Sequence, residues 1–168
     1  MLLTFAQLGL FRARITSTIM DEWTSNLIAN KPQIEASVRQ QAEAITEVFE
    51  ECFVLGFVPL IEGLELPDKD DRHVLAAAIK CSAQVIVTEN LRDFPNDILE
   101  QYGVEALNAD DMLANTYDLY PIECARALRV VRRRYDNPHF TPSEFLLDLT
   151  KCGMPKLAAM ARASIEYL

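Results

Sequence analysis

Residues 67–94 read PDKDDRHVLAAAIKCSAQVIVTENLRDF and contain the clearest structural pattern in the chain. Asp70 and Asp71 stand just before an apolar run, VLAAAIKC, at the kind of position where acidic residues begin a helix. The next run, QVIVT, is short and largely apolar, which predicts a strand buried on both faces. A helix followed by a buried strand is typical of parallel α/β sheets, so this stretch predicts that class.

Helices and short strands are also expected on both sides of this stretch. Upstream, the spacing of apolar residues predicts three helices. The first runs over 2–13, the second begins at the capping hydroxyls of residues 16–18 and ends at 28, and the third runs over 32–51. The segment CFVLGFVPLI, residues 52–61, is β-rich and predicts a short strand region. Downstream, we expect a helix over 95–102, a strand over 104–107 and a helix over 109–117. Beyond Pro121 only helices are expected, over 122–135, 142–151 and 156–167.

This order of elements predicts a three-layer α/β fold with a central parallel sheet over residues 1–118. Residues 119–168 are then a helical C-terminal extension that packs on the same domain. A chain of 168 residues is long enough to bury one substantial core.

The composition is that of an ordinary globular protein, with 50% hydrophobic and 24% charged residues. No run approaches the roughly 18 apolar residues of a membrane helix, and the first arginines follow the apolar N-terminal run, unlike those of a signal peptide. We therefore expect a cytoplasmic protein that does not enter membranes. The four cysteines are widely separated, which predicts free thiols.

The formal charge of −9 is unevenly distributed, because arginines gather between residues 126 and 134. Arg129, Arg132 and Arg133 are the candidates there for contact with RNA phosphates or with an acidic partner. A solvated helix face is the simpler interpretation of the same pattern.

Several acidic residues fall at the expected ends of elements, among them Glu22, Asp71 and Asp93. The carboxyl ends of parallel strands form the usual ligand site of an open α/β sheet. Carboxylates that converge there suit Mg²⁺ or Mn²⁺, and such a centre hydrolyses phosphodiesters. From pattern alone, however, Asp70 or Asp71 is also explained as a helix cap.

Two motifs in the stretch resemble the signature of PIN-domain proteins of the bacterial VapC-like toxin type. DRHVLAA, beginning at Asp71, fits D-x-x-[apolar]-x-A-A, and TENLRDF, beginning at Thr88, fits T-x-N-x-x-D-F. Upstream, GLFRARITSTIMDEW is similar to the family's first helix and to the helix that carries its acidic residue, which places Glu22 at that position. The resemblance covers about residues 2–112 and implies a PIN-like fold.

The resemblance implies a metal-dependent endoribonuclease that cleaves RNA, often as the toxin of a toxin–antitoxin pair. It implies Glu22, Asp71 and Asp93 as catalytic carboxylates that hold Mg²⁺ or Mn²⁺. Three further residues would support them by polar contacts, namely Asp70, Thr88 and Asn90. Because the first and last helices are apolar, a homodimer or a bound antitoxin protein is expected, although the tail could equally cover its own sheet.

The N-terminus departs from the family's pattern, in which a short apolar strand ending in an aspartate precedes the first helix. Met1 falls where that helix should be, so we expect the first strand and its carboxylate to be missing. The alternative to an active nuclease is therefore a catalytically inactive, truncated PIN-like binding module. A third hypothesis is a helical interaction protein in which the acidic residues only cap helices.

Three other features receive structural interpretations. His73 has no serine or cysteine partner at a recognisable spacing, so it is expected to support the structure or a neighbouring functional residue. Asp110 and Asp111 are expected to cap the helix around Met112, and Trp23 is expected in the core.

Overall fold

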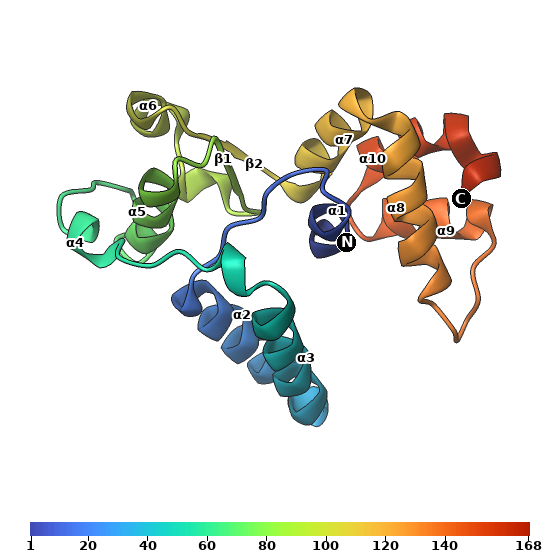
Figure 1. Ribbon diagram of the computed structural model, residues 1–168, viewed down its shortest axis with the longest axis horizontal. Helices are drawn as coiled ribbons and strands as arrows, with labels where there is room; N and C mark the ends of the chain where they lie inside the picture. The colour runs from blue at the N-terminus through green and yellow to red at the C-terminus, as the bar shows by residue number, and fades with distance from the viewer. The chain divides into compact units, whose positions relative to one another are not determined.

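The computed structural model describes all residues, 1–168, and the chain forms two compact units. The first, here called the α/β unit, comprises residues 14–86 and 92–105. The second, here called the helical unit, comprises residues 1–13, 87–91 and 106–168. Figure 1 labels the α-helices and the two strands. The predicted boundary between residues 118 and 119 stays a prediction.

A helical hairpin forms much of the α/β unit (Figure 1). It consists of α2 (Ser17–Asn30), the 3₁₀ turn η1 (Pro32–Ile34) and α3 (Glu35–Val48). The hydroxyl of Thr16 accepts a hydrogen bond from the Ile19 N–H at 3.1 Å, which confirms the predicted N-terminal cap of α2. Each helix buries only a narrow face, with Met20 buried on α2 and Val38 on α3.

The strand region predicted over residues 52–61 is wrong apart from one residue pair. Phe53 forms an isolated parallel bridge with Ile15, and the rest of the segment lies in η2 (Glu50–Cys52), a turn, and α4 (Val58–Ile61). Gly56 adopts a φ of +71°, in the left-handed region that interrupts an extended chain. Pro59 then stands in the first turn of α4, where its missing N–H is tolerated.

The helix and strand predicted between residues 67 and 94 are confirmed as α5 (Arg72–Cys81) and β1 (Val85–Val87). The predicted burial of this strand on both faces is wrong, because only Ile86 is buried and Val87 is 38% exposed. The elements that follow are η3 (Leu91–Asp93), α6 (Asn96–Leu99), η4 (Glu100–Tyr102) and β2 (Glu105–Leu107). Glu105 N–H donates to the Gln84 carbonyl, and Thr88 N–H donates to the Leu107 carbonyl, so the two strands run parallel. The α/β class is confirmed, with a sheet of two strands.

The helical unit confirms the helical C-terminal part. Its elements are α1 (Leu2–Gln7), α7 (Ala109–Leu119), α8 (Pro121–Arg133), α9 (Pro142–Lys151), α10 (Pro155–Ala161) and η5 (Arg162–Tyr167). The predicted first helix is shorter than expected, because Gly9 takes a φ of +77° just after α1. Phe5 of α1 and Phe145 of α9 are fully buried in one core with residues of α7, α8 and α10. No helix of either unit combines the length and apolar composition needed to cross a membrane.

Asp110 caps a different helix from the one expected. Asn108, not Asp110, caps α7 by accepting the Asp111 N–H at 2.7 Å. The buried carboxylate of Asp110 instead accepts the N–H groups of Lys156 at 3.0 Å and Leu157 at 2.9 Å, at the start of α10. The prediction for Asp110 is therefore wrong, because its carboxylate binds donors that are distant in the sequence. The prediction for Asp111 is also wrong, because its carboxylate accepts the side-chain amide of Asn108 and caps no backbone N–H of α7.

Candidate metal centre

Three carboxylates converge in the α/β unit, each supplied by a different local feature. Asp68 lies in the loop before α5, Asp71 stands at the N-terminal end of α5, and Asp93 ends η3. One oxygen from each lies within 4.8 Å of the others. Hard oxygen ligands at this spacing suit Mg²⁺ or Mn²⁺.

Asp71 occupies the N-cap position of α5 but does not cap it. Its side chain makes no capping hydrogen bond, so the purely structural interpretation of this residue is not supported. Burial raises the pKa of Asp71 above its ordinary value, and the charges of Asp68 and Asp93 raise it further. The nearby His73 lowers this pKa, and Glu22 adds a smaller rise. The fold thus holds like charges together, which is the environment that a divalent cation would stabilise.

Asp68 is the member of this group that sequence reasoning missed. Its Oδ1 accepts the Asp70 N–H at 2.8 Å, which fixes the loop that leads into α5. Asp70 itself is exposed and contributes this backbone N–H, while its carboxylate lies outside the three-residue group. The available signal was the first aspartate in PDKDD, three positions before Asp71.

Glu22 lies beside the group without belonging to it. It projects from α2, and its Oε1 lies 3.1 Å from Nε2 of His73 on α5. Glu22 is close enough to Asp71 to influence the charge there. The structure therefore brings the predicted Asp71 and Asp93 together, adds Asp68, and keeps Glu22 at their side through His73.

Comparison with known proteins identifies the family of this chain. The family model described as "PIN domain" matches residues 1–92, which is more than half of the chain. The chain belongs to the PIN-domain family. A second model, described as "VapC50 C-terminal domain", matches residues 109–163.

One curated relative of this PIN domain is "Putative ribonuclease VapC50" of Mycobacterium tuberculosis. The two sequences are 42% identical over 111 residues, which is 66% of this chain and 64% of the relative. The chain thus spans less than two thirds of the relative's length. No solved structure gives a significant match.

Thr88 and Asn90 of the PIN signature form a local turn just after β1. The Thr88 hydroxyl accepts the Asn90 N–H at 3.0 Å. Thr88 therefore orders the backbone of the T-x-N motif, as side-chain hydroxyls do in such turns.

The arginines of α8 divide into exposed and engaged side chains. Arg129 and Arg133 are exposed, and with Arg126 they share one face of the helix. Arg132 is partly buried, and its guanidinium donates to the carbonyls of Phe140 and Leu168. These hydrogen bonds hold the end of the chain to α8. The exposed cationic face of the helix therefore consists of Arg126, Arg129 and Arg133.

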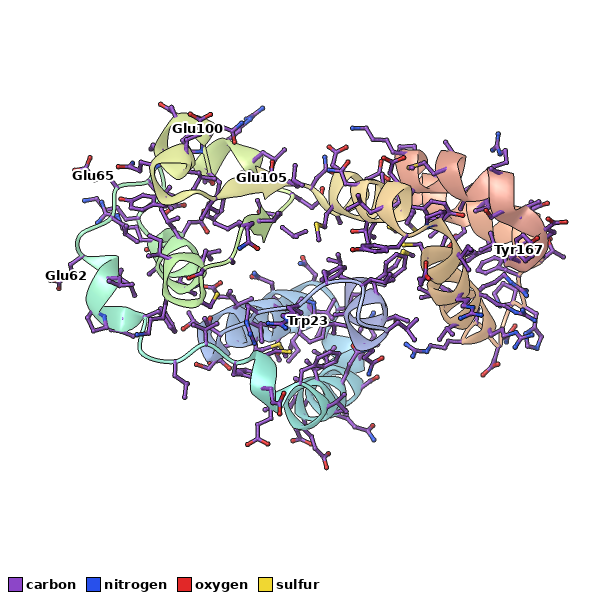
Figure 2. The ribbon with its side chains drawn as sticks, turned by 45° about the horizontal axis from the view of Figure 1, so that its top comes forward. Trp23, Glu62, Glu65, Glu100, Glu105 and Tyr167 are labelled. Atoms are coloured by element: carbon purple, nitrogen blue, oxygen red, sulfur yellow. The ribbon has the colours of Figure 1, made fainter.

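Trp23 is not a core residue of the PIN domain, contrary to the prediction. Its side chain, labelled in Figure 2, is 37% exposed on α2. Met20 is the buried residue of that helix, and Trp23 lies outside its narrow buried face.

The raised pKa of Asp71 predicts a pH dependence for the metal-free protein. Because the folded chain holds this proton more tightly than the unfolded chain, its stabilising contribution is present below the ordinary value of 3.8. That contribution is lost as pH rises through the raised pKa. Added Mn²⁺ should therefore raise the melting temperature at neutral pH and do so less as the solution is acidified. Thermal melts with and without Mn²⁺, between about pH 4 and pH 8, would check this. A rise in melting temperature on adding Mn²⁺ that becomes larger in acid would contradict it.

Asp68→Asn tests the newly found carboxylate. Asparagine keeps an oxygen that can accept the Asp70 N–H, so the loop should persist while one negative charge is removed. We expect Mn²⁺ affinity to fall about tenfold, as measured by isothermal titration. Glu65→Gln removes an exposed charge outside the group and is the matched control. Equal Mn²⁺ affinity of the Asp68→Asn variant and the control would show that Asp68 is not a metal ligand.

Proposed function

We propose that this PIN domain is a metal-dependent endoribonuclease acting in the cytoplasm, as the toxin of a toxin–antitoxin pair. The observation that carries the proposal is the convergence of Asp68, Asp71 and Asp93 within 4.8 Å at the PIN signature. A relative named as a ribonuclease supports RNA as the substrate class.

Asp68, Asp71 and Asp93 would hold Mg²⁺ or Mn²⁺, with Glu22 beside them. The bound cation would activate water and stabilise the charge that develops on the phosphorus oxygens. The chain's own residues supply these ligand oxygens and hold them close together. Thr88 orders the signature turn at Asn90 within its own unit.

The exposed arginines of α8 are proposed to contact RNA phosphates. Arg126, Arg129 and Arg133 present guanidinium groups on one face of an otherwise acidic chain. Phosphate contacts of this kind position a nucleic acid without reading its sequence. Arg132 keeps its guanidinium on backbone carbonyls and would act only by holding this face in place.

An antitoxin is proposed to cover apolar residues that the α/β unit leaves exposed. Leu55 is 80% exposed, and Val48 and Val58 are also largely uncovered. Contiguous exposed apolar surface is typical of sites that bind a protein partner, and these residues are proposed to form such a surface. A second copy of the chain is the other occupant of such a surface, and light scattering of the purified protein distinguishes a dimer from a monomer.

The function is tested by incubating the purified chain with a mixed-sequence single-stranded RNA at low salt. We expect internal cleavage with Mg²⁺ or Mn²⁺, loss of cleavage with EDTA, and recovery when excess metal is returned. A DNA strand of the same sequence tests whether the substrate is RNA. Metal binding without cleavage of either strand would favour the inactive binding module, and absence of both would contradict the proposed metal centre.

A further inference from the structure

We propose that His73 is a positioning residue for Glu22, which it holds at the edge of the three-carboxylate centre. This inference rests on the proposed metal-dependent function and concerns how the site is kept ready for its cation. It assigns a specific part to a histidine whose spacing in the sequence suggested no catalytic partner.

The contact joins two helices that otherwise pack on different neighbours. His73 Nε2 on α5 lies 3.1 Å from Glu22 Oε1 on α2. Helix α2 packs chiefly on α3, whereas α5 packs chiefly on α4. The pair therefore fixes the position of one carboxylate rather than adding to a broad helix interface.

The two side chains differ in exposure in a way that suits this role. The His73 side chain is only 10% exposed and is held by the packing of α5, whereas the Glu22 side chain is 52% exposed. An isolated glutamate that is half exposed on a helix samples several rotamers, and a hydrogen bond to a fixed ring reduces that freedom. A buried donor thus orients a mobile acceptor beside Asp71.

The second ring nitrogen argues against a purely structural histidine. Nδ1 of His73 is buried and has no hydrogen-bond partner, so the contact with Glu22 is the ring's polar interaction. A histidine kept only for core packing is better replaced by an apolar residue, since buried polar atoms are destabilising unless they are paired. Polar groups that break this rule are concentrated at functional sites.

The inference is tested by two substitutions that differ in hydrogen-bonding ability. His73→Gln retains an amide donor that can reach Glu22, whereas His73→Leu fills similar space without a donor. We expect His73→Leu to weaken Mn²⁺ binding roughly 10- to 100-fold and His73→Gln to recover most of the loss. Isothermal titration with Mn²⁺ measures both, and Asp21→Asn, an exposed neighbour of Glu22 on α2, is the matched control.

A double-mutant cycle separates positioning from general damage. In a Glu22→Gln background, His73→Leu should cause little further loss of Mn²⁺ affinity, because the group that it positions is already changed. Additive losses would overturn the inference. Equal Mn²⁺ affinities of the wild type and His73→Leu would also overturn the inference, but they would leave the proposed metal centre intact.

A spectroscopic measurement covers the case in which His73→Leu fails to fold. The ¹⁵N chemical shift of the His73 Nε2 should move in Glu22→Gln, which leaves the buried ring intact. An unchanged shift would overturn the inference. If the wild-type chain binds no Mn²⁺ at all, the proposed function fails first and the inference fails with it.

Discussion

Asp71→Asn should lower the rate of RNA cleavage about 10³-fold, which corresponds to a loss of roughly 4 kcal/mol in transition-state stabilisation. The substitution removes one charge from the centre of the carboxylate group and changes almost nothing in shape. It should not disturb α5, because the Asp71 side chain makes no capping bond to that helix. Single-turnover cleavage of a labelled RNA at saturating Mn²⁺ measures the effect.

The same variant should keep or raise the stability of the metal-free protein. Asp71 is crowded by Asp68 and Asp93, so neutralising it relieves repulsion between like charges. Asp97→Asn, which neutralises an exposed carboxylate on α6, should leave cleavage unchanged. Cleavage by Asp71→Asn at the wild-type rate would exclude the proposed site, while loss of activity together with unfolding would leave a structural explanation standing.

Asp71 and Asp93 were predicted from the resemblance to PIN domains, whose motifs set each of them at a fixed distance from a regular element. Asp71 precedes the apolar residues of α5, and Asp93 closes the motif after β1. Once the helix and strand are placed, the positions of these two residues are largely determined. Motifs of this kind encode local geometry, which a single sequence contains.

Asp68 and His73 were harder to predict because their roles depend on contacts between segments. Asp68 joins the group through the path of a loop held by the Asp70 N–H, and no periodicity describes that path. His73 contacts Glu22 on a helix far away in the sequence. Both facts depend on tertiary structure, for which one sequence carries no direct signal.

The errors in the fold have local physical causes. Short apolar runs do not distinguish a strand from a turn followed by a helix, and the run at 52–61 was of this kind. The positive φ values of Gly9 and Gly56 set the end of α1 and the turn before α4. For Trp23, apolar character suggested burial, but α2 has little core to pack against.

Asp110→Ala should destabilise the helical unit by about 3 kcal/mol, since two hydrogen bonds to a carboxylate are lost and their backbone donors remain. Those donors are the N–H groups of Lys156 and Leu157, and the Leu157 bond is buried. Alanine offers neither of them an acceptor. Hydrogen exchange of the α10 amides reports the loss in this unit directly, whatever the stability of the α/β unit.

Asp111→Ala is the matched control, because it removes the neighbouring carboxylate from the same helix. Asp111 pairs with the exposed ammonium of Lys156, and such surface pairs contribute little to stability. Exchange at Leu157 should therefore accelerate strongly in Asp110→Ala and only slightly in Asp111→Ala. Equal acceleration would mean that charge near α10, rather than the two directed hydrogen bonds, holds this helix in place. The comparison thus separates a buried cap from a surface ion pair with two substitutions one residue apart.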